Sequence, residues 1–297
     1  MKRRQTKQPR SSDTPPQGQA PHSEASWDSV ASWYDSLVGD KGSEYHRQVV
    51  IPGTLRLLGL QRGERVLDLA CGQGVLSQAL YQQGAQVTGV DLSHELIQRA
   101  RQRSPRAIRY LVADARNLDI LPDEAFDAIT CVLAAQNIDP IEPVFAECAR
   151  LLKPDGRLAL VISHPAFRIP RQSRWGWDEG RRLLYRVVDR YLSPLKIPID
   201  TRPFRAPGQV TWTYHRPLQA YINGLAAVGL WVNALEEWPS HKVSQPGPVA
   251  QAENRARDEF PMFLALRATR VPRTMPTHEE DSATAGSPEE GLNPSPL

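Results

Sequence analysis

The sequence predicts an α/β domain built on a doubly wound, mostly parallel sheet. Between about residues 65 and 163, short apolar runs suited to buried strands alternate with segments whose apolar residues have helical spacing. The first run, "RVLDLA", is followed by the small-residue turn "CGQG" and then by the helical segment "GVLSQALYQQG", which Gly84 ends. Because strands joined by helices of this length need right-handed crossovers, the alternation indicates parallel strands.

The remaining elements continue the same alternation of strands and helices. "AQVTGVD", "AIRYLVAD", "AFDAITCVLAA" and "RLALVIS" are predicted as the second to fifth strands, and "SHELIQRARQRS", with Ser93 as N-cap, and "PIEPVFAECARLL" as helices. Further on, "RPLQAYINGLAAVGL" predicts a helix that ends near Gly229. "WVNALEEW" and "FPMFLALRAT" then predict two strands, which supply an antiparallel edge to the sheet.

Residues 164–208 break the alternation, because they are rich in Arg, Pro and Trp. We expect an inserted lid after the fifth strand, with two extra strands in "RRLLYRVVDRYL" and "QVTWTYH". Residues 1–25 and 272–297 are rich in Pro, Ser and charged side chains, and the first of them lacks the apolar core of a secretory signal. Both are predicted to be disordered tails that flank a domain of residues 26–271.

Composition excludes few partners. A net charge of +3 demands neither nucleic acid nor an anionic membrane. No apolar stretch reaches the roughly 18 residues that a membrane span requires. Cys71, Cys131 and Cys148 match the spacing of neither a disulfide framework nor a metal site, which favours a reduced, cytoplasmic setting without a structural metal.

The glycine turn and two acids indicate a nucleoside ligand. Gly72 and Gly74 allow a tight bend and a close approach of ligand to backbone N–H groups, at the end of the sheet where such folds bind ligands. Asp91 follows the second strand, where a carboxylate accepts the hydroxyls of a ribose. Asp68 would repel a pyrophosphate but suits an ammonium group, and Ser77 stands where the dinucleotide fingerprint has Gly or Ala. These residues argue against a phosphate-rich ligand.

Four segments together resemble the class I S-adenosylmethionine-dependent methyltransferases. "VLDLACGQG", "VTGVDLS", "VADARNL" and "LLKPDGRLAL" are similar to motifs of that family in order and spacing, and the resemblance covers about residues 30 to 269. It implies the Rossmann-like methyltransferase fold and S-adenosyl-L-methionine as cofactor. It also implies cofactor contacts at Tyr34, Asp68, Ala70, Gly72, Gly74, Asp91, Leu92, Asp114, Ala115, Ala134, Gln136 and Asn137. Tyr34 resembles a tyrosine that closes over the cofactor from the N-terminal helix in related small-molecule enzymes.

Each of these acids has a structural alternative. Asp68 would cap the following turn, Asp91 would cap the second helix, and Asp114 would be an ordinary loop acid. Tyr34 would dock the first helix on the core.

The acceptor is less well specified. Methyl transfer is an in-line displacement that works largely by alignment, so a base is optional. If the acceptor is a hydroxyl or an acidic carbon, His164 after the fifth strand is the first candidate base, with Tyr214 and His215 as further candidates. The alternative for His164 is that "SHP" only turns the chain.

The insertion is predicted to form the acceptor pocket. Phe167, Arg168, Trp175 and Trp177 would supply an aromatic wall and a charge for an acidic group. Interleaved arginines and aromatics also suit nucleic acid. The loop after the fourth strand, however, lacks the Asp/Asn-Pro-Pro-aromatic motif of the nucleic-acid enzymes that methylate amino groups.

We therefore predict methyl transfer from S-adenosylmethionine to a small organic acceptor. The alternatives are an RNA or protein methyltransferase, a non-catalytic binder of the cofactor and, less well supported, an oxidoreductase that uses a dinucleotide. The sequence does not specify an oligomeric state.

Overall fold

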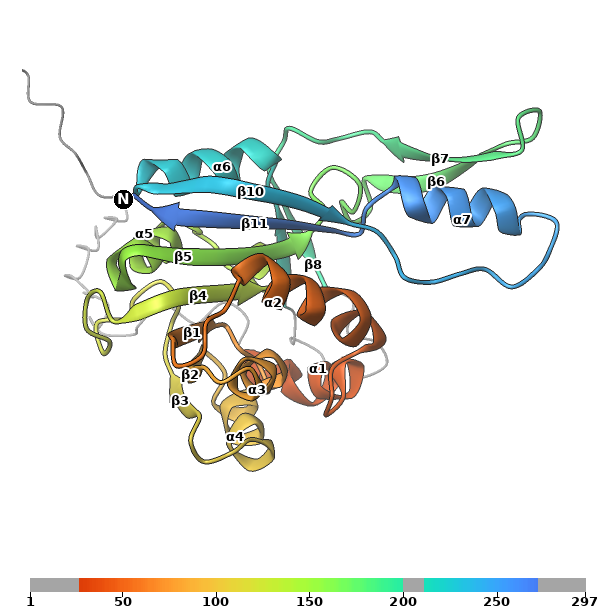
Figure 1. Ribbon diagram of the computed structural model, residues 1–297. Helices are drawn as coiled ribbons and strands as arrows, with labels where there is room; N and C mark the ends of the chain where they lie inside the picture. Colours follow the sequence, from red (N-terminus) through yellow and green to blue (C-terminus); the bar gives the residue numbers. More distant parts are fainter. Residues whose placement is uncertain (1–26, 200–210, 272–297) are drawn as a thin grey trace, which may run out of the picture.

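The computed structural model describes residues 27–199 and 211–271, and its centre is a seven-stranded sheet (Figure 1). The strand order is β10-β11-β5-β4-β1-β2-β3. The parallel strands are β1 (Arg65–Leu69), β2 (Gln86–Asp91), β3 (Arg109–Val112), β4 (Phe126–Val132) and β5 (Leu152–Ser163). Chain order reverses between β1 and β4, which is where doubly wound sheets open a ligand crevice. The predicted fold class is confirmed.

The far edge of the sheet is antiparallel, as predicted. β11 (Phe263–Arg270) lies between β5 and β10 (Leu230–Trp238) and runs antiparallel to both. Three consecutive residues of β11 are almost fully buried: Leu264, Ala265 and Leu266. A strand with a neighbour on each side and helices on both faces of the sheet has no solvent-exposed face.

Helices cover both faces of the sheet. α3 (Val75–Gln82) and α4 (His94–Arg103) pack on one face, with the end of α2 (Ile51–Leu58), against alternate strand residues such as Val66 and Val87. α5 (Glu142–Leu151) and α6 (Leu218–Ala227) pack on the other face, against Leu67 and Leu160. Successive strand residues point to opposite faces, so each strand contributes to both cores.

The chain reaches the sheet through η1 (Trp27–Val30), α1 (Ala31–Val38) and the π-helical turn η2 (His46–Val50). The η1–α1 segment is tied to α4 at two points. Asp28 accepts hydrogen bonds from the Ser93 hydroxyl (2.5 Å) and the Glu95 N–H (3.1 Å), and Asp35 pairs with Arg99 (2.6 Å) and Arg103. Ser93 also caps α4 as predicted, by accepting the Leu96 N–H at 3.1 Å.

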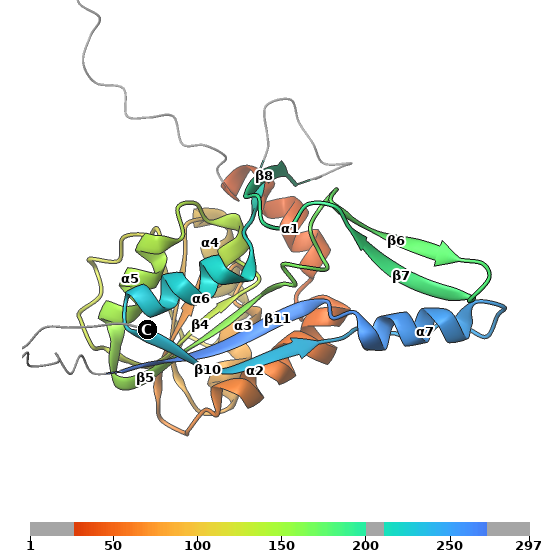
Figure 2. The same cartoon turned by 90° about the horizontal axis from the view of Figure 1, so that it is seen from above.

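After β5 the chain leaves the body of the domain. β6 (Ser173–Asp178) and β7 (Leu183–Val188) form an antiparallel hairpin that projects sideways with α7 (Ala250–Glu259) beside it, as Figure 2 shows. β8 (Leu195–Pro198) pairs with β9 (Trp212–His215). The two extra strands predicted in the insertion are thus present as β7 and β9.

The predicted tails and part of the predicted lid, residues 200–208, lie outside the described residues. Within residues 27–199 and 211–271, no helix combines the length and the apolar character needed to cross a membrane.

Candidate functional site

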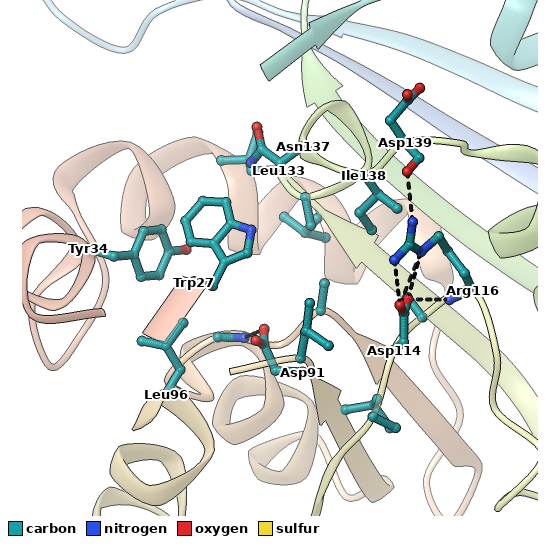
Figure 3. A pocket seen from close by; sticks show the side chains of 18 of the residues that line it. Trp27, Tyr34, Asp91, Leu96, Asp114, Arg116, Leu133, Asn137, Ile138 and Asp139 are labelled. Carbon is teal, nitrogen blue, oxygen red and sulfur yellow. Dashed lines mark hydrogen bonds and ion pairs between the residues drawn. The ribbon is translucent and has the colours of Figure 1, made fainter. Parts of the chain in front are cut away.

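A cavity of about 690 Å³ opens at the carboxyl ends of β1, β2 and β4, where the strand order reverses (Figure 3). Its size is typical of small-molecule sites. It is lined by Trp27, Tyr34, Ala70, Gly72, Val90, Asp91, Leu92, Leu96, Ala113, Asp114, Ala115, Arg116, Val132, Leu133, Ala134, Asn137, Ile138, Asp139 and Tyr214. Nine of the residues that the family resemblance assigned to the cofactor are therefore brought together: Tyr34, Ala70, Gly72, Asp91, Leu92, Asp114, Ala115, Ala134 and Asn137.

Asp91 lies at the floor of this cavity, at the end of β2. Its Oδ2 accepts the Gly72 N–H at 2.8 Å and its Oδ1 accepts the Ser93 N–H at 2.9 Å. Only 8% of the residue is exposed, and burial raises the pKa of its carboxyl against these two hydrogen bonds. The carboxylate thus both shapes the glycine turn and faces the cavity.

Asp68 lies deeper, beneath the glycine turn. The Ser77 hydroxyl donates to its Oδ2 at 2.6 Å and the Thr130 hydroxyl to its Oδ1 at 3.0 Å. It faces a small side hollow, lined also by Tyr34 and Ala70, rather than the large cavity. Ser77, which replaces the small third residue of a dinucleotide fingerprint, is the residue that holds this acid.

Burial raises the pKa of Asp68 to about 6, against the hydrogen bonds from Ser77 and Thr130, and the charge of Asp91 adds to the increase. Neither acid forms an ion pair with any residue in the described part of the chain. Two buried carboxyls without a cation make this end of the site electronegative.

One side of the cavity is closed by two aromatic rings from the N-terminal segment (Figure 3). Trp27 and Tyr34 pack edge to face, with ring centroids 5.9 Å apart, and burial raises the pKa of the Tyr34 hydroxyl. Trp27 was not predicted as a site residue. Its signal in the sequence is its place seven residues before Tyr34, which is two helical turns.

Arg116 dominates the opposite side of the cavity, and it too was not predicted (Figure 3). Its Nη2 donates to Asp114 Oδ2 at 2.7 Å and its Nη1 to the Asp139 carbonyl at 2.9 Å. The hydrogen bonds from Arg116 lower the pKa of the Asp114 carboxyl. Arg116 therefore links the loop after β3 to the loop after β4 across one end of the cavity.

Besides Asp68, two predicted cofactor residues do not line the cavity, Gln136 and Gly74. Gln136 turns its amide back to the Leu133 carbonyl, to which Nε2 donates at 2.8 Å. Gly74 lies against Tyr110, whose hydroxyl oxygen would be 2.4 Å from a Cβ at position 74. Gly74 thus makes room for packing between the turn and β3.

Of the three predicted bases, Tyr214 lines the cavity whereas His164 and His215 do not. His164 is 5% exposed; its Nε2 lies 2.6 Å from Glu237 Oε1, and its Nδ1 accepts the N–H groups of Ala166 (3.2 Å) and Phe167 (3.3 Å). These contacts place His164 in the turn-forming role that was its structural alternative. His215 Nε2 lies 2.6 Å from the Tyr191 carbonyl oxygen.

The four residues predicted to wall the acceptor pocket also lie outside the cavity: Phe167, Arg168, Trp175 and Trp177. They belong to the loop after β5 and to β6, and the β6–β7 hairpin projects away from the body of the domain (Figure 2). Trp27, Arg116 and Tyr214 occupy the walls instead.

Comparison with known proteins agrees with this geometry. Residues 67–160 match the family described as "Methyltransferase domain". A demethylmenaquinone methyltransferase from Tropheryma whipplei (strain Twist) is 38% identical over 112 residues, which are 37% of this chain and 46% of that protein. A ubiquinone biosynthesis O-methyltransferase from Xanthomonas oryzae pv. oryzae (strain PXO99A) is 40% identical over 101 residues, which are 33% of this chain and 42% of that protein. The matched segment spans less than half the length of either relative.

Solved structures extend the likeness beyond that segment. An S-adenosylmethionine-dependent methyltransferase from Mesorhizobium loti superposes with a TM-score of 0.59 at 28% identity, over 78% of this chain and 100% of the other. One from Listeria monocytogenes, described as putative, gives 0.57 at 26% identity, over 74% of this chain and 98% of the other. The cavity with its glycine turn, the matched domain and these structures lead to one conclusion: residues 67–160 form a methyltransferase domain, within a fold that the chain shares with S-adenosylmethionine-dependent methyltransferases.

Proposed function

We propose that this protein transfers a methyl group from S-adenosylmethionine to a small organic acceptor. The observation that carries the proposal is the pair of buried acids without a cation among the described residues, Asp68 and Asp91, beside a cavity of about 690 Å³. A ligand that carries an ammonium and a sulfonium group offsets their charge, whereas the pyrophosphate of a dinucleotide would add to it.

The residues of the cavity fit the parts of that cofactor. The outward side of the Asp91 carboxylate suits the ribose hydroxyls, and Asp114 with the backbone of Ala115 suits the adenine. Gly72 of the glycine turn and Tyr34 of α1 line the end of the cavity that suits the methionine part of the cofactor. When bound, S-adenosylmethionine supplies an electrophilic methyl group.

The protein's own contribution to the reaction is positioning. Trp27 and Tyr34 exclude water from one side of the cavity, and the walls around Leu133 and Tyr214 hold the acceptor so that its nucleophilic atom faces the methyl carbon. The new bond to the methyl carbon forms as the carbon–sulfur bond breaks, and the electron pair of that bond stays on sulfur. The acceptor's proton leaves to water or to a group at the cavity wall, where Tyr214 is the remaining predicted candidate.

We propose a flat aromatic acceptor, because the rings of Trp27 and Tyr214 line the same cavity as the cofactor residues. The curated relatives are named for quinone compounds, which have flat rings. Three cysteines without disulfide partners support a cytoplasmic setting for the reaction.

A nucleic-acid or protein acceptor has less support. Two insertion arginines already have partners, because Arg174 pairs with Asp189 at 3.1 Å and Arg182 donates to the Pro248 carbonyl at 2.6 Å. Transfer of a labelled methyl group distinguishes an enzyme from a non-catalytic binder of the cofactor.

The test is calorimetric titration of S-adenosylmethionine and, separately, of NAD into the wild type, Asp91→Asn and Asp127→Asn. Asp127 is the matched control, because it also accepts a backbone N–H (Arg65, 2.8 Å) but lines no part of the cavity. We expect S-adenosylmethionine alone to bind, with affinity reduced about tenfold or more by Asp91→Asn and unchanged by Asp127→Asn.

Tighter binding of NAD, or equal affinity in all three proteins, would overturn the assignment of the cofactor. If the cofactor binds, transfer of labelled methyl to a panel of hydroxylated aromatic compounds tests catalysis. Binding without transfer to those compounds, or to nucleic acid or protein, favours the non-catalytic alternative.

A further inference from the structure

Two arginines share one tryptophan ring at the base of the projecting hairpin. Arg168 follows β5 and Arg186 lies on β7, opposite Trp175 of β6. Their guanidinium carbons lie 5.8 Å and 5.0 Å from the Trp175 ring centroid. We call Arg168, Trp175 and Arg186 the hairpin-base cluster. None of these three residues lines the large cavity, so the cluster is separate from the proposed methyl-transfer site.

Neither arginine has a carboxylate partner among the described residues. Arg186 donates to the Phe167 carbonyl at 2.8 Å and to the Ser173 hydroxyl at 2.7 Å, both of which are neutral. Arg168 has a single long contact, 3.5 Å from Nη2 to the Phe260 carbonyl, and its Nε is buried without a hydrogen-bond partner. Arg174 of the same hairpin, by contrast, pairs with Asp189.

This arrangement is electrostatically unfavourable without a further group. Burial lowers the pKa of Arg168, and burial together with the charge of Arg168 lowers that of Arg186. Two partly buried like charges with no counter-charge repel each other, and a buried donor without a partner adds its own cost.

Aromatic rings surround the two guanidinium groups. Phe167 and Trp175 each meet Phe260 edge to face, with centroids 5.5 Å and 5.4 Å apart, and Phe167 stacks on His164 at 4.7 Å. These rings displace water and so strengthen the attraction of any anion to the arginines. Trp175 is 38% exposed, and Arg168 and Arg186 are partly exposed, so the cluster reaches the protein surface.

We infer that the hairpin-base cluster is an anion-binding site that takes a carboxylate or phosphate group, with Arg168 and Arg186 as its ligands. A guanidinium offers paired N–H donors that match both kinds of oxyanion, and the free Nε–H of Arg168 is one such donor. The anion neutralises the two charges and satisfies that donor. The inference does not depend on methyl transfer.

The probe is inorganic phosphate, with acetate and benzoate as the carboxylate arms, each titrated at constant ionic strength while the melting temperature is recorded. Anions that bind only the folded state raise the melting temperature with their concentration. We expect such a rise in the wild type with phosphate or with a carboxylate. The anion whose effect saturates at the lower concentration identifies which kind of oxyanion the site binds.

Arg168→Met should abolish the rise, because methionine keeps the apolar stem but has no donor. The variant should be at least as stable as the wild type without anion, since it removes a repulsive charge. Arg168→Lys should weaken the response several-fold without abolishing it. Arg174→Met is the matched control on the same hairpin and should respond as the wild type does.

A second measurement follows the Arg168 Nε–H resonance by NMR, which should shift on addition of the anion. Equal melting responses in the wild type and Arg168→Met, or an Nε–H resonance that does not move, would overturn the inference. The inference would also be overturned if a single-stranded oligonucleotide binds the wild type and if Arg168→Met and Arg174→Met weaken that binding equally. Such a result would show a diffuse basic surface instead of a site.

Discussion

The backbone N–H of Gly72 donates to Oδ2 of Asp91 at 2.8 Å, so the glycine turn after β1 and the acid after β2 are one structural unit. Two motifs that are separate in the sequence are thereby made mutually dependent. A change in the turn moves the carboxylate, and loss of the carboxylate releases the turn.

Gly72→Ala should therefore impair cofactor binding. Gly72 has φ +55°, and a Cβ there would lie 3.3 Å from Cε1 of Tyr34, so the substitution both strains the backbone and presses on the ring that closes the cavity. Gly59→Ala is the matched control, because Gly59 has φ +60° but no atom within 4 Å of its added Cβ. Both variants should lose about 1 kcal/mol of stability in denaturant melts. Only Gly72→Ala should lose affinity in S-adenosylmethionine titrations, and equal affinities would contradict this prediction.

Asp68→Asn should change how stability depends on pH. The pKa of Asp68 is about 6 in the folded protein against an ordinary value of 3.8, so between those values the folded state binds more protons than the unfolded state. The free energy of unfolding therefore falls as pH rises through this window and stays low above it. Asparagine does not titrate, so the free energy of unfolding of the variant should exceed that of the wild type by about 3 kcal/mol at pH 7.5, and this excess should be lost near pH 4.

Asp127→Asn is the opposite control for that experiment. Burial would raise the pKa of Asp127, but the hydrogen bonds from Lys153 and the Arg65 backbone outweigh it and lower that pKa. Asp127 therefore stabilises the fold above the ordinary pKa of an aspartate, and its contribution is lost as pH falls. Urea melts at several pH values measure both variants, and parallel profiles for wild type and Asp68→Asn would exclude a titrating Asp68.

Asp35→Asn should loosen the segment that carries Trp27 and Tyr34. Asp35 pairs with Arg99 and Arg103, and its side chain is 18% exposed. Asp40 also contacts Arg103, at 3.0 Å, but is 75% exposed and so serves as the control. We expect several-fold weaker cofactor binding for Asp35→Asn and wild-type binding for Asp40→Asn, because exposed pairs contribute little. Hydrogen exchange of residues 31–38 should rise in the first variant alone.

His164→Ala should destabilise the protein without the kinetic signature of a lost base. The ring joins Glu237 to the turn after β5, so its removal should cost on the order of 1 to 3 kcal/mol and leave cofactor affinity unchanged. His164→Asn, which keeps one acceptor for the turn, should recover part of the loss. A variant of normal stability with a lower rate and a shifted pH profile would instead identify His164 as the base.

The sequence was most informative where structure is set by neighbouring residues. The glycine turn, Asp91 and Asp114 follow successive strands, and parallel strands bring their carboxyl ends to one edge, so their meeting was predictable. The direction of the β6–β7 hairpin was not, because its neighbour α7 lies more than sixty residues further along the chain. The wall predicted from Trp175 and Trp177 was consequently misplaced. Trp27 and Arg116 were found only once the fold was known, whereas Tyr214, predicted as a candidate base, does line the cavity.

The position of β11 has a consequence for how the protein is made. β10 is synthesised before β11, yet its partner in the sheet is β11, which also covers the edge of β5. Until residues 263–270 have left the ribosome, β5 presents an open edge and β10 has no strand to join. From the completion of β5 until β11 emerges, the nascent chain therefore exposes an unpaired strand edge, and completion of the sheet depends on one of the last segments of the domain to appear.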